Sequence, residues 1–398
     1  MTWQMFKNFS QRVRIMFALA LVLQSALLAA TGASRANNAE PSIVIDAGSG
    51  AVLSGNRAFD RWYPASLTKL MTVYVTMQAI RSGEIAPGSP VTMSKLAASQ
   101  PPSKMGFAPG IRLRVDTALQ ILVVKSANDV AIALAESVAG SVPLFVERMN
   151  AAAKSLGMAD SHFANPNGLH SAEQYSSARD LAVLSRRIFS EFPQFSKIFS
   201  VPAIRYGDEV DYSYNLLLER FDGADGMKTG FICASGYNMV ASATRNGRHL
   251  IAVVLGAFSQ TDRAVEAARL LLAGFEANGG EPVDSYINSG AAVQPVSKRA
   301  TICSKSAYET RYDPGAGAAK IDSPLLGPRR NVGSPLVVTT GGIDAPPSEA
   351  FLTAALAPKS KVPVPQPRPG SRDIDGERVT SLPAIRGSIP LPVKRPDR

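Results

Sequence analysis

Three short polar motifs follow one another along this chain of 398 residues, and each lies beside a strongly apolar segment. They are Ser66–Lys69 (SLTK), Ser126–Asn128 (SAN) and Lys228–Gly230 (KTG). Each motif alone is a weak signal, because a Ser followed three residues later by a Lys is expected by chance about once or twice in such a chain. Together they predict a serine acyl-transfer site in which lysine takes the part that histidine plays in other serine hydrolases.

The first motif lies at the start of a predicted buried helix. Apolar residues occur on nearly every face from Leu70 to Ile80, which is typical of a helix surrounded by core. Ser66 would open this helix, where N–H groups at the positive end of the helix dipole can stabilise an oxyanion. Lys69 follows one turn later on the same face, and a buried lysine loses its proton more easily and can act as a general base. The alternative is a serine N-cap followed by an exposed lysine.

The second motif interrupts two apolar helical stretches, residues 117–124 and 130–140. The interruption, Lys125–Asp129, is polar throughout except for one alanine. Buried polar groups cost free energy unless they are hydrogen-bonded, so a functional role would explain the cluster. The alternative is an ordinary connection in which Asn128 or Asp129 caps the second helix.

The third motif precedes a predicted β-hairpin. Residues 236–256 form two apolar strand-like runs joined by an Asn-Gly turn, the strongest short-range signal for a hairpin. Residues 228–232 are therefore expected on a neighbouring strand at a sheet edge. There Lys228 and Thr229 can face an anionic substrate, while Gly230 lets another backbone approach closely. The alternative is a strand that begins after a solvated loop.

These motifs resemble those of the low-molecular-mass penicillin-binding proteins, the serine-type D-Ala-D-Ala carboxypeptidases of bacterial cell walls. The resemblance extends from about Pro41 to Glu276. It implies a serine β-lactamase and penicillin-binding-protein-like α/β fold, with an antiparallel sheet covered by helices. Besides the three motifs, four segments are similar to the family: Asn165–Leu169, Gln174–Leu181, Asp225–Gly226 and Gly236–Ala243.

The resemblance implies catalytic roles for three side chains. Ser66 is the acylated nucleophile, Lys69 is its base, and Ser126 relays a proton to the leaving group. The N–H groups of Ser66 and Phe231 form the oxyanion hole. Phe231 stands where many relatives carry a polar residue or a histidine.

The resemblance also implies how substrate is held. Asn128 holds the substrate amide, and Lys228, Thr229 and Gly230 form the strand that binds the terminal carboxylate of a peptide or of a β-lactam. Arg263 matches a basic position that helps to recognise this carboxylate.

The implied activity is removal of the terminal D-alanine from peptidoglycan pentapeptides, with penicillin as a covalent ligand. A D,D-endopeptidase and a weak β-lactamase are alternatives with the same chemistry, and a non-catalytic scaffold that binds wall peptides is an alternative of another class. Two lysines retained near a buried serine argue against an idle site, because unpaired buried charges are costly.

No cofactor or metal is expected. The histidines, His162, His170 and His249, are scattered without ligand spacing, which argues against a zinc peptidase and against a Ser-His-Asp triad.

Residues 1–36 predict a secretory signal. Lys7, Arg12 and Arg14 precede an apolar core, and Ser34–Ala36 suits cleavage after Ala36. The mature protein is therefore expected outside the cytoplasmic membrane, in the periplasm or on the cell wall. An uncleaved transmembrane anchor is the alternative, since the apolar stretch is near the lower limit for spanning a bilayer.

The net charge of +10 does not indicate a nucleic-acid partner, because of where the charge lies. Residues 37–280, the predicted catalytic domain, carry 22 basic and 21 acidic side chains, so this region is nearly neutral. Residues 281–398 carry 16 basic and 11 acidic side chains and could contact the anionic cell wall.

The sequence also predicts how the chain is divided into parts, beginning with the catalytic region. It begins with a hairpin of residues 42–46 and 51–53, and a mostly helical subdomain lies between Val91 and Asp225. Residues 281–398 are rich in Pro, Gly, Ser and Ala and are predicted to be a largely disordered tail. Prolines near its end argue against a C-terminal membrane helix.

The chain has two cysteines, Cys233 beside the third motif and Cys303 in the tail. In an oxidising compartment they could pair and clip the start of the tail to the catalytic domain. The sequence leaves both states open, because it does not give the distance between their Cα atoms.

Overall fold

The structure, a computed structural model, describes residues 40–287, 294–311 and 323–342. The predicted signal at residues 1–36 lies outside the described residues, as do the proline-rich stretch at residues 361–370 and the C-terminal end.

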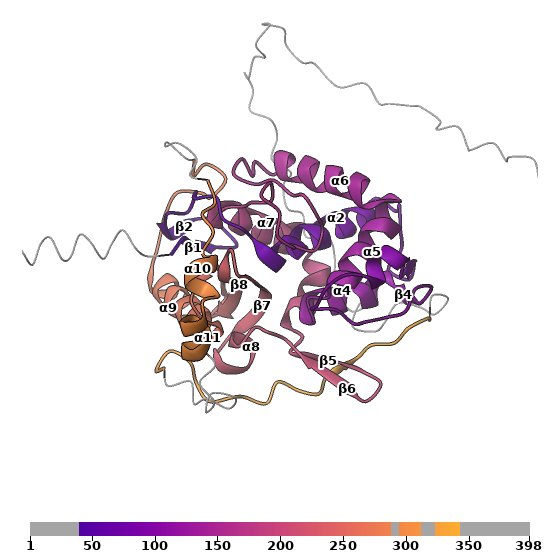
Figure 1. Cartoon of the computed structure of the whole chain (residues 1–398). Helices are drawn as coiled ribbons and strands as arrows, with labels where there is room; N and C mark the ends of the chain where they lie inside the picture. The colour runs from indigo at the N-terminus through magenta and orange to yellow at the C-terminus, as the bar shows by residue number, and fades with distance from the viewer. Residues whose placement is uncertain (1–39, 288–293, 312–322, 343–398) are drawn as a thin grey trace, which may run out of the picture. The chain divides into compact units, whose positions relative to one another are not determined.

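A five-stranded antiparallel sheet forms the centre of the fold (Figure 1). Its strand order is β2-β1-β9-β8-β7, so β7 is an edge strand. The strands are β1 (Ser42–Asp46), β2 (Val52–Asn56), β7 (Ala224–Ile232), β8 (Gly236–Arg245) and β9 (Arg248–Ala257). The antiparallel sheet and both predicted hairpins are confirmed, and the third motif lies on the predicted edge strand.

The β8–β9 turn shows why the local sequence predicts this hairpin. Asn246 and Gly247 have φ angles of 49° and 76°. Such left-handed values at both central positions belong to the type I′ turn, whose twist matches that of the flanking strands. Asn and Gly adopt them at low cost, and the pairing of Arg245 with Arg248 follows.

Helices cover both faces of the sheet, and the side chains of β1 alternate between the two cores. Val44 lies in the cluster that packs against α9 (Gln260–Glu276). Ile43 and Ile45 lie in the larger cluster on the opposite face. That cluster includes buried residues of α2 (Lys69–Arg81) and α7 (Ala178–Glu191). A strand with both faces buried explains why the three central residues of β1 are all apolar.

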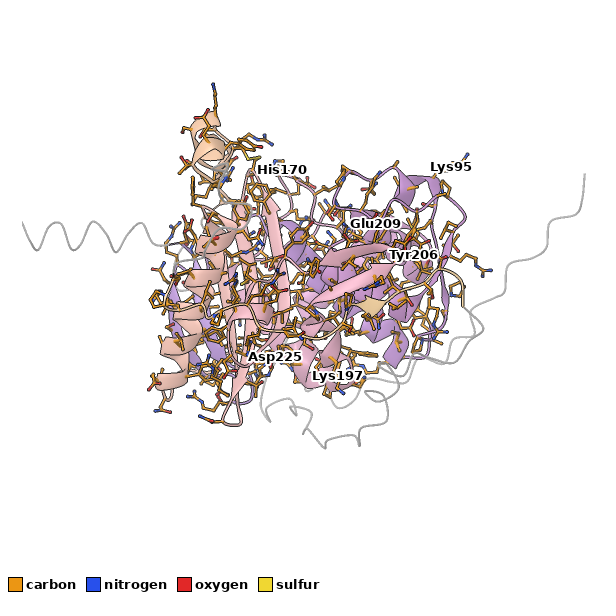
Figure 2. All side chains as sticks on the ribbon, turned by 90° about the horizontal axis from the view of Figure 1, so that it is seen from below. Lys95, His170, Lys197, Tyr206, Glu209 and Asp225 are labelled. Carbon is orange, nitrogen blue, oxygen red and sulfur yellow. A yellow bond between two sulfur atoms is a disulfide. The ribbon has the colours of Figure 1, made fainter. Side chains whose placement is uncertain are left out.

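The predicted mostly helical subdomain is present between the first helix and β7. Its longer helices are α4 (Val115–Val124), α5 (Asn128–Ala139) and α6 (Val142–Ser155). Its shorter elements are β3 (Pro90–Thr92), α3 (Lys95–Ala98), β4 (Arg112–Arg114), η2 (Pro193–Ser200), β5 (Ala203–Tyr206), β6 (Glu209–Tyr212) and α8 (Leu217–Arg220). A short turn of 3-10 helix, η1 (Ala65–Thr68), directly precedes α2 and lies outside this subdomain. Figure 2 marks the β5–β6 hairpin by Tyr206 and Glu209 and the start of β7 by Asp225.

Within the described ranges, no single helix combines the length and apolarity needed to cross a bilayer. Only α5 and α6 taken together reach that length and composition, and they are bent by 85° relative to each other.

The segment after residue 280 is more ordered in its described parts than the sequence predicted. Cys233 and Cys303 form a disulfide with a Cα–Cα distance of 5.6 Å. The segment contains α10 (Arg299–Ile302), α11 (Lys305–Arg311) and β10 (Leu336–Val337). β10 pairs in parallel with β5, and the N–H of Gly341 donates to the carbonyl of Arg112. The amino-acid composition did not predict this order, because the segment is ordered by its attachment to the catalytic domain and not by a hydrophobic core of its own.

Truncation should therefore lower stability. A chain that ends at residue 280 loses the disulfide and the pairing of β10, and closing a loop of 70 residues contributes up to about 4 kcal/mol to the free energy of unfolding. We expect its melting temperature to fall, while a chain that ends at Gly342 keeps these contacts and melts like the full chain. Scanning calorimetry of the three forms checks this. Equal melting temperatures for the two truncations would contradict it.

Candidate active site

Ser66 lies in the turn η1, directly before α2 begins at Lys69. Two glycines let other segments approach this turn. A Cβ added to Gly230 would lie 2.9 Å from the backbone nitrogen of Ser66, and one added to Gly168 would lie 2.0 Å from the carbonyl oxygen of Ala65. The close backbone approach predicted for Gly230 is thus present, and its target is the Ser66 turn itself.

The Lys69 side chain is fully buried directly behind Ser66. Its Nζ lies 3.1 Å from Ser66 Oγ and 2.8 Å from Asn128 Oδ1, and it also donates to the carbonyl oxygen of Asn167. A neutral amine has two N–H groups and one lone pair. When both N–H groups of the neutral amine are donated to the two asparagine oxygens, the lone pair is left to accept the proton of the Ser66 hydroxyl.

Burial holds the pKa of Lys69 well below its usual value, and the nearby charge of Lys228 lowers it further. The carboxylate of Asp129 opposes this shift but is the smallest of the three effects. The lowered pKa favours the neutral amine, which is the form that can accept a proton. The alternative of an exposed lysine after a serine cap is wrong.

Both asparagines that bind Lys69 are held in place by further hydrogen bonds. Asn128 Nδ2 donates to the carbonyl of Pro101 at 2.9 Å. Asn167 Nδ2 donates to Gln100 Oε1 at 3.0 Å. Asn128 does not act as the cap of α5, because its oxygen is used on Lys69 and the N-cap residue is Ala127.

Asn167 belongs to the segment Asn165–Leu169, which carried family resemblance but no predicted role. Thr72 on α2 donates to the carbonyl of Pro166 at 2.6 Å, which ties this loop to the helix that carries Lys69. The contribution of Asn167 to the site is a backbone oxygen, so its side-chain type gave no signal. The available signal in the sequence was the glycine at position 168, which the structure shows with a φ of 84° and with Ala65 close by.

Ser126 lies between α4 and α5 with a left-handed φ of 60° and lines the same cavity as Ser66. Its neighbour Lys125 does not face the cavity and forms an ion pair with Asp211 on β6. The polar interruption between the two helices is therefore divided between the site and the β5–β6 hairpin.

β7 forms the opposite wall. Lys228 is buried, and its Nζ donates to the carbonyl of Thr229 at 3.0 Å. Burial, followed by the nearby charge of Arg263, lowers the pKa of Lys228 to about 7. Thr229 and Phe231 line the cavity, and Phe231 is 40% exposed.

Arg263, in the first turn of α9, reaches the same cavity although it is nearly fully buried. Its guanidinium donates to the carbonyls of Tyr214 at 2.9 Å and Asn238 at 3.3 Å. Burial lowers the pKa of Arg263 to about 10. Its Nε is buried and has no hydrogen-bond acceptor among the described residues.

The cavity between these elements measures about 350 Å³. Its lining includes most of the predicted site residues, with Lys69 and Lys228 immediately behind it: Ser66, Ser126, Asn128, Thr229, Gly230, Phe231 and Arg263. In the described part of the chain, no group of three or more His, Cys, Asp or Glu side chains is placed to hold a metal ion.

Asn238 on β8 is a site residue that the sequence analysis missed. Its Nδ2 donates to the carbonyls of Tyr63 at 2.9 Å and Pro64 at 3.2 Å, and its Oδ1 accepts from Gly256 N at 2.9 Å. These bonds tie the chain entering Ser66 to the sheet. A fully buried amide within an apolar strand was the available signal.

A comparison with known protein families matches residues 29–259 to peptidase family S11, described as D-alanyl-D-alanine carboxypeptidase. The match covers more than half of the chain. The chain belongs to this family. The resemblance read from the three motifs is thereby confirmed.

Proteins with similar sequences support this assignment. The chain is 38% identical over 242 residues to the D-alanyl-D-alanine carboxypeptidase DacA of Haemophilus influenzae, covering 60% of this chain and 62% of that protein. It is 34% identical over 285 residues to DacA of Escherichia coli, covering 67% and 71%. The match to the first of these spans less than two thirds of its length.

Solved structures show the same fold. Penicillin binding protein 5 from Haemophilus influenzae aligns with a TM-score of 0.57 and 37% identity, over 60% of this chain and 71% of that one. Penicillin binding protein 6B from Escherichia coli aligns with a TM-score of 0.57 and 38% identity, over 60% and 77%. The predicted fold class is confirmed.

Replacing Gly168 should disturb the base. In Gly168→Ala, the new Cβ would clash with the Ala65 carbonyl and push the Asn167 oxygen away from Lys69. We expect acylation of Ser66 by a fluorescent penicillin to slow by about 10²-fold, the order of loss that follows a misplacement of about 1 Å. Gly157→Ala is the matched control, because Gly157 also has a positive φ (68°) but open space around it. Equal acylation rates in the two variants would refute the positioning role of this loop.

The pKa of Lys228 predicts a pH dependence. Because this pKa lies at about 7 in the ligand-free site, the positive charge is present below pH 7 and is lost as pH rises. We expect the second-order acylation rate for a carboxylate-bearing β-lactam to decline above about pH 7, and Lys228→Arg to move this decline to higher pH, since arginine stays protonated. The uncharged methyl ester of the same β-lactam serves as control and should lack the decline. Identical profiles for acid and ester would contradict the assignment.

Proposed function

We propose that this protein is a serine D-Ala-D-Ala carboxypeptidase that removes the terminal D-alanine from peptidoglycan pentapeptides through an acyl-enzyme on Ser66. The observation that carries the proposal is the buried Lys69 amine, 3.1 Å from Ser66 Oγ, with two carbonyl oxygens fixing its other donors. Membership of the S11 family supports the same activity.

Acylation begins with proton transfer from Ser66 Oγ to the neutral Lys69 amine. The resulting oxygen nucleophile attacks the carbonyl of the penultimate D-alanine. The developing oxyanion accepts hydrogen bonds from the N–H groups of Ser66 and Phe231, which the approach of Gly230 brings to one place. A donor of this kind contributes roughly 3 to 4 kcal/mol of transition-state stabilisation.

The C–N bond then breaks, and the leaving D-alanine amine takes the proton that Lys69 accepted, relayed by the Ser126 hydroxyl that lines the same cavity. Lys69 is thereby neutral again. Asn128 also lines this cavity, and its side chain can hydrogen-bond the amide of the substrate. Water next attacks the ester, with the same amine as base, and restores Ser66 while releasing the shortened peptide.

Selection of a terminal carboxylate follows from the charge of the site. Lys228 and Arg263 are both buried, and burial lowers the pKa of each; the charge of Arg263 lowers the pKa of Lys228 further. A substrate carboxylate beside Thr229 supplies the missing negative charge and favours protonated Lys228 again. The site therefore suits a scissile bond whose leaving residue carries a free carboxylate, as the terminal D-alanine does.

β-Lactams are proposed ligands of the same site. Among similar solved structures, Penicillin-Binding Protein D2 from Listeria monocytogenes has been determined in cefotaxime-bound and ampicillin-bound forms, at 28% identity. A β-lactam carries a carboxylate near its reactive carbonyl and therefore suits the same cationic wall. A weak β-lactamase differs only in how fast water reaches the ester.

We also propose that the protein works outside the cytoplasmic membrane, in the periplasm or on the cell wall. The basic n-region and apolar core within residues 1–36 support secretion. The Cys233–Cys303 disulfide suits an oxidising compartment. The basic excess of residues 281–398 supports contact with anionic wall polymers.

Mass spectrometry of muropeptides tests the activity. We expect the purified chain without residues 1–36 to remove one alanine from pentapeptides, and Ser66→Ala to remove none, because the nucleophile is gone. Benzylpenicillin should label Ser66 in peptide maps.

Conversion of crosslinked dimers to monomers, without loss of the terminal alanine, would instead establish an endopeptidase. Intact muropeptides together with no penicillin adduct would support the non-catalytic scaffold and refute the proposal.

A further inference from the structure

The residue proposed to complete the oxyanion hole lies on a strand with limited support. β7 is the last strand of the sheet and pairs with β8 on one side only, while its other edge faces the cavity. Phe231 lies one residue before the end of β7 at Ile232. Among the described residues, no further strand pairs with the open edge of β7 and restrains its amide groups.

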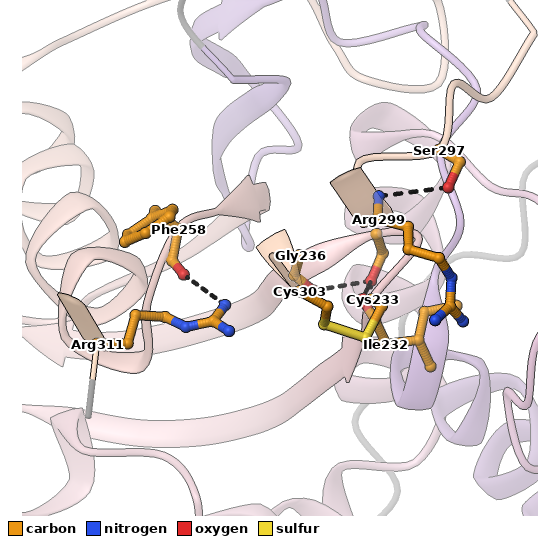
Figure 3. Close-up of a disulfide and its surroundings, with 9 residues drawn as sticks. Ile232, Cys233, Gly236, Phe258, Ser297, Arg299, Cys303 and Arg311 are labelled. Atoms are coloured by element: carbon orange, nitrogen blue, oxygen red, sulfur yellow. Dashed lines mark hydrogen bonds between the residues drawn. A yellow bond between two sulfur atoms is a disulfide. The ribbon is translucent and has the colours of Figure 1, made fainter. Parts of the chain in front are cut away.

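A disulfide fastens the chain immediately after this strand. Cys233 is bonded to Cys303, which is the C-cap of α10 (Figure 3). Within the same short turn, the carbonyl of Ala234 accepts from Lys298 N at 2.9 Å. Ile302 is buried beside Cys303. The turn that ends β7 is thus held at two successive residues by one C-terminal segment.

The same segment supports Phe231 from a second direction. The ring of Phe231 stacks on that of Tyr237, its partner in the β7–β8 register, with centroids 4.3 Å apart. The guanidinium of Arg311, at the end of α11, lies 5.5 Å from the centroid of the Tyr237 ring. Arg311 also donates to the carbonyl of Phe258 at 3.3 Å (Figure 3).

We propose that the segment Lys298–Arg311, locked by the Cys233–Cys303 disulfide, positions the Phe231 amide for acyl transfer. The inference rests on the proposed function, because it assumes that this amide receives the oxyanion. Cys303 and Arg311 touch no reacting atom and act as positioning residues.

The physical reason is the narrow tolerance of an oxyanion hole. A donor stabilises the transition state only when it lies about 2.7 to 3.1 Å from the oxyanion. An edge strand whose end is released can shift by more than this range while keeping its hydrogen bonds to β8. The carboxylate contacts lie earlier on β7 at Lys228 and Thr229 and on α9 at Arg263, so ligand binding should change less than the rate of bond formation.

Two variants test the disulfide and the Arg311–Tyr237 contact separately. Cys233→Ser/Cys303→Ser removes the disulfide, and Arg311→Ala removes the support behind Tyr237 while keeping the disulfide. Glu309→Ala is the matched control on α11, because its only described ion pair is with the exposed Lys305. All three variants are made in the protein that spans residues 37–398, and they are assayed well below their melting temperatures.

Two measurements distinguish positioning from stability. Stopped-flow acylation by a fluorescent penicillin gives the binding constant and the acylation rate constant separately. Infrared difference spectra give the stretching frequency of the acyl-enzyme ester carbonyl, which rises when its hydrogen bonds weaken. We expect both variants to acylate about tenfold more slowly with binding constants within about twofold, and to show a raised ester frequency. Glu309→Ala should match the wild type.

A wild-type rate constant and an unchanged ester frequency in both variants would overturn the inference, even if their melting temperatures fall. If the cysteine variant does not fold, the wild type treated with a phosphine reductant replaces it, with the untreated protein as reference. A wild type that is not acylated at Ser66 would instead refute the proposed function.

Discussion

Burial of the Lys69 amine is the constraint on which the site depends. An amine removed from water needs a polar partner for each donor, because an unsatisfied buried donor costs about 1 to 3 kcal/mol. The fold supplies these partners from three segments far apart in sequence: the Ser66 turn, the start of α5 at Asn128, and the Asn167 loop. The packing of α2, α5 and this loop is therefore also the assembly of the base.

The charge balance of the cavity follows from the same burial. Lys69, Lys228 and Arg263 are all buried around one small cavity; the charge of Lys228 lowers the pKa of Lys69, and the charge of Arg263 lowers the pKa of Lys228. Asp129 is the acidic group that acts on Lys69, but its carboxylate is engaged by the N–H groups of Met105 and Gly106. An anionic ligand would therefore complement the charge of this site and favour the protonated form of Lys228.

The sequence predicted the parts of the fold that local chemistry determines. The β8–β9 hairpin follows from Asn246 and Gly247, and the two helices around Ser126 follow from apolar runs with a polar break. What it could not predict depends on distant pairing. The Asn167 contact uses a backbone oxygen that every residue type has, and the order of the C-terminal segment depends on which cysteine and which strand it meets.

The edge position of β7 explains why its supports lie where they do. An edge strand leaves backbone N–H and C=O groups open on one side, and such groups can bind an extended peptide. A further strand would stabilise β7 but would fill the cavity. Contacts that fix β7 must therefore lie at its two ends or on the side that does not face the substrate. Asn215 Nδ2 donates to the carbonyl of Gly226 at the start of the strand, Gly230 rests against the Ser66 turn in the middle, and Cys233 fastens the end. The open edge and the disulfide are two consequences of one requirement, that the strand stay both accessible and fixed.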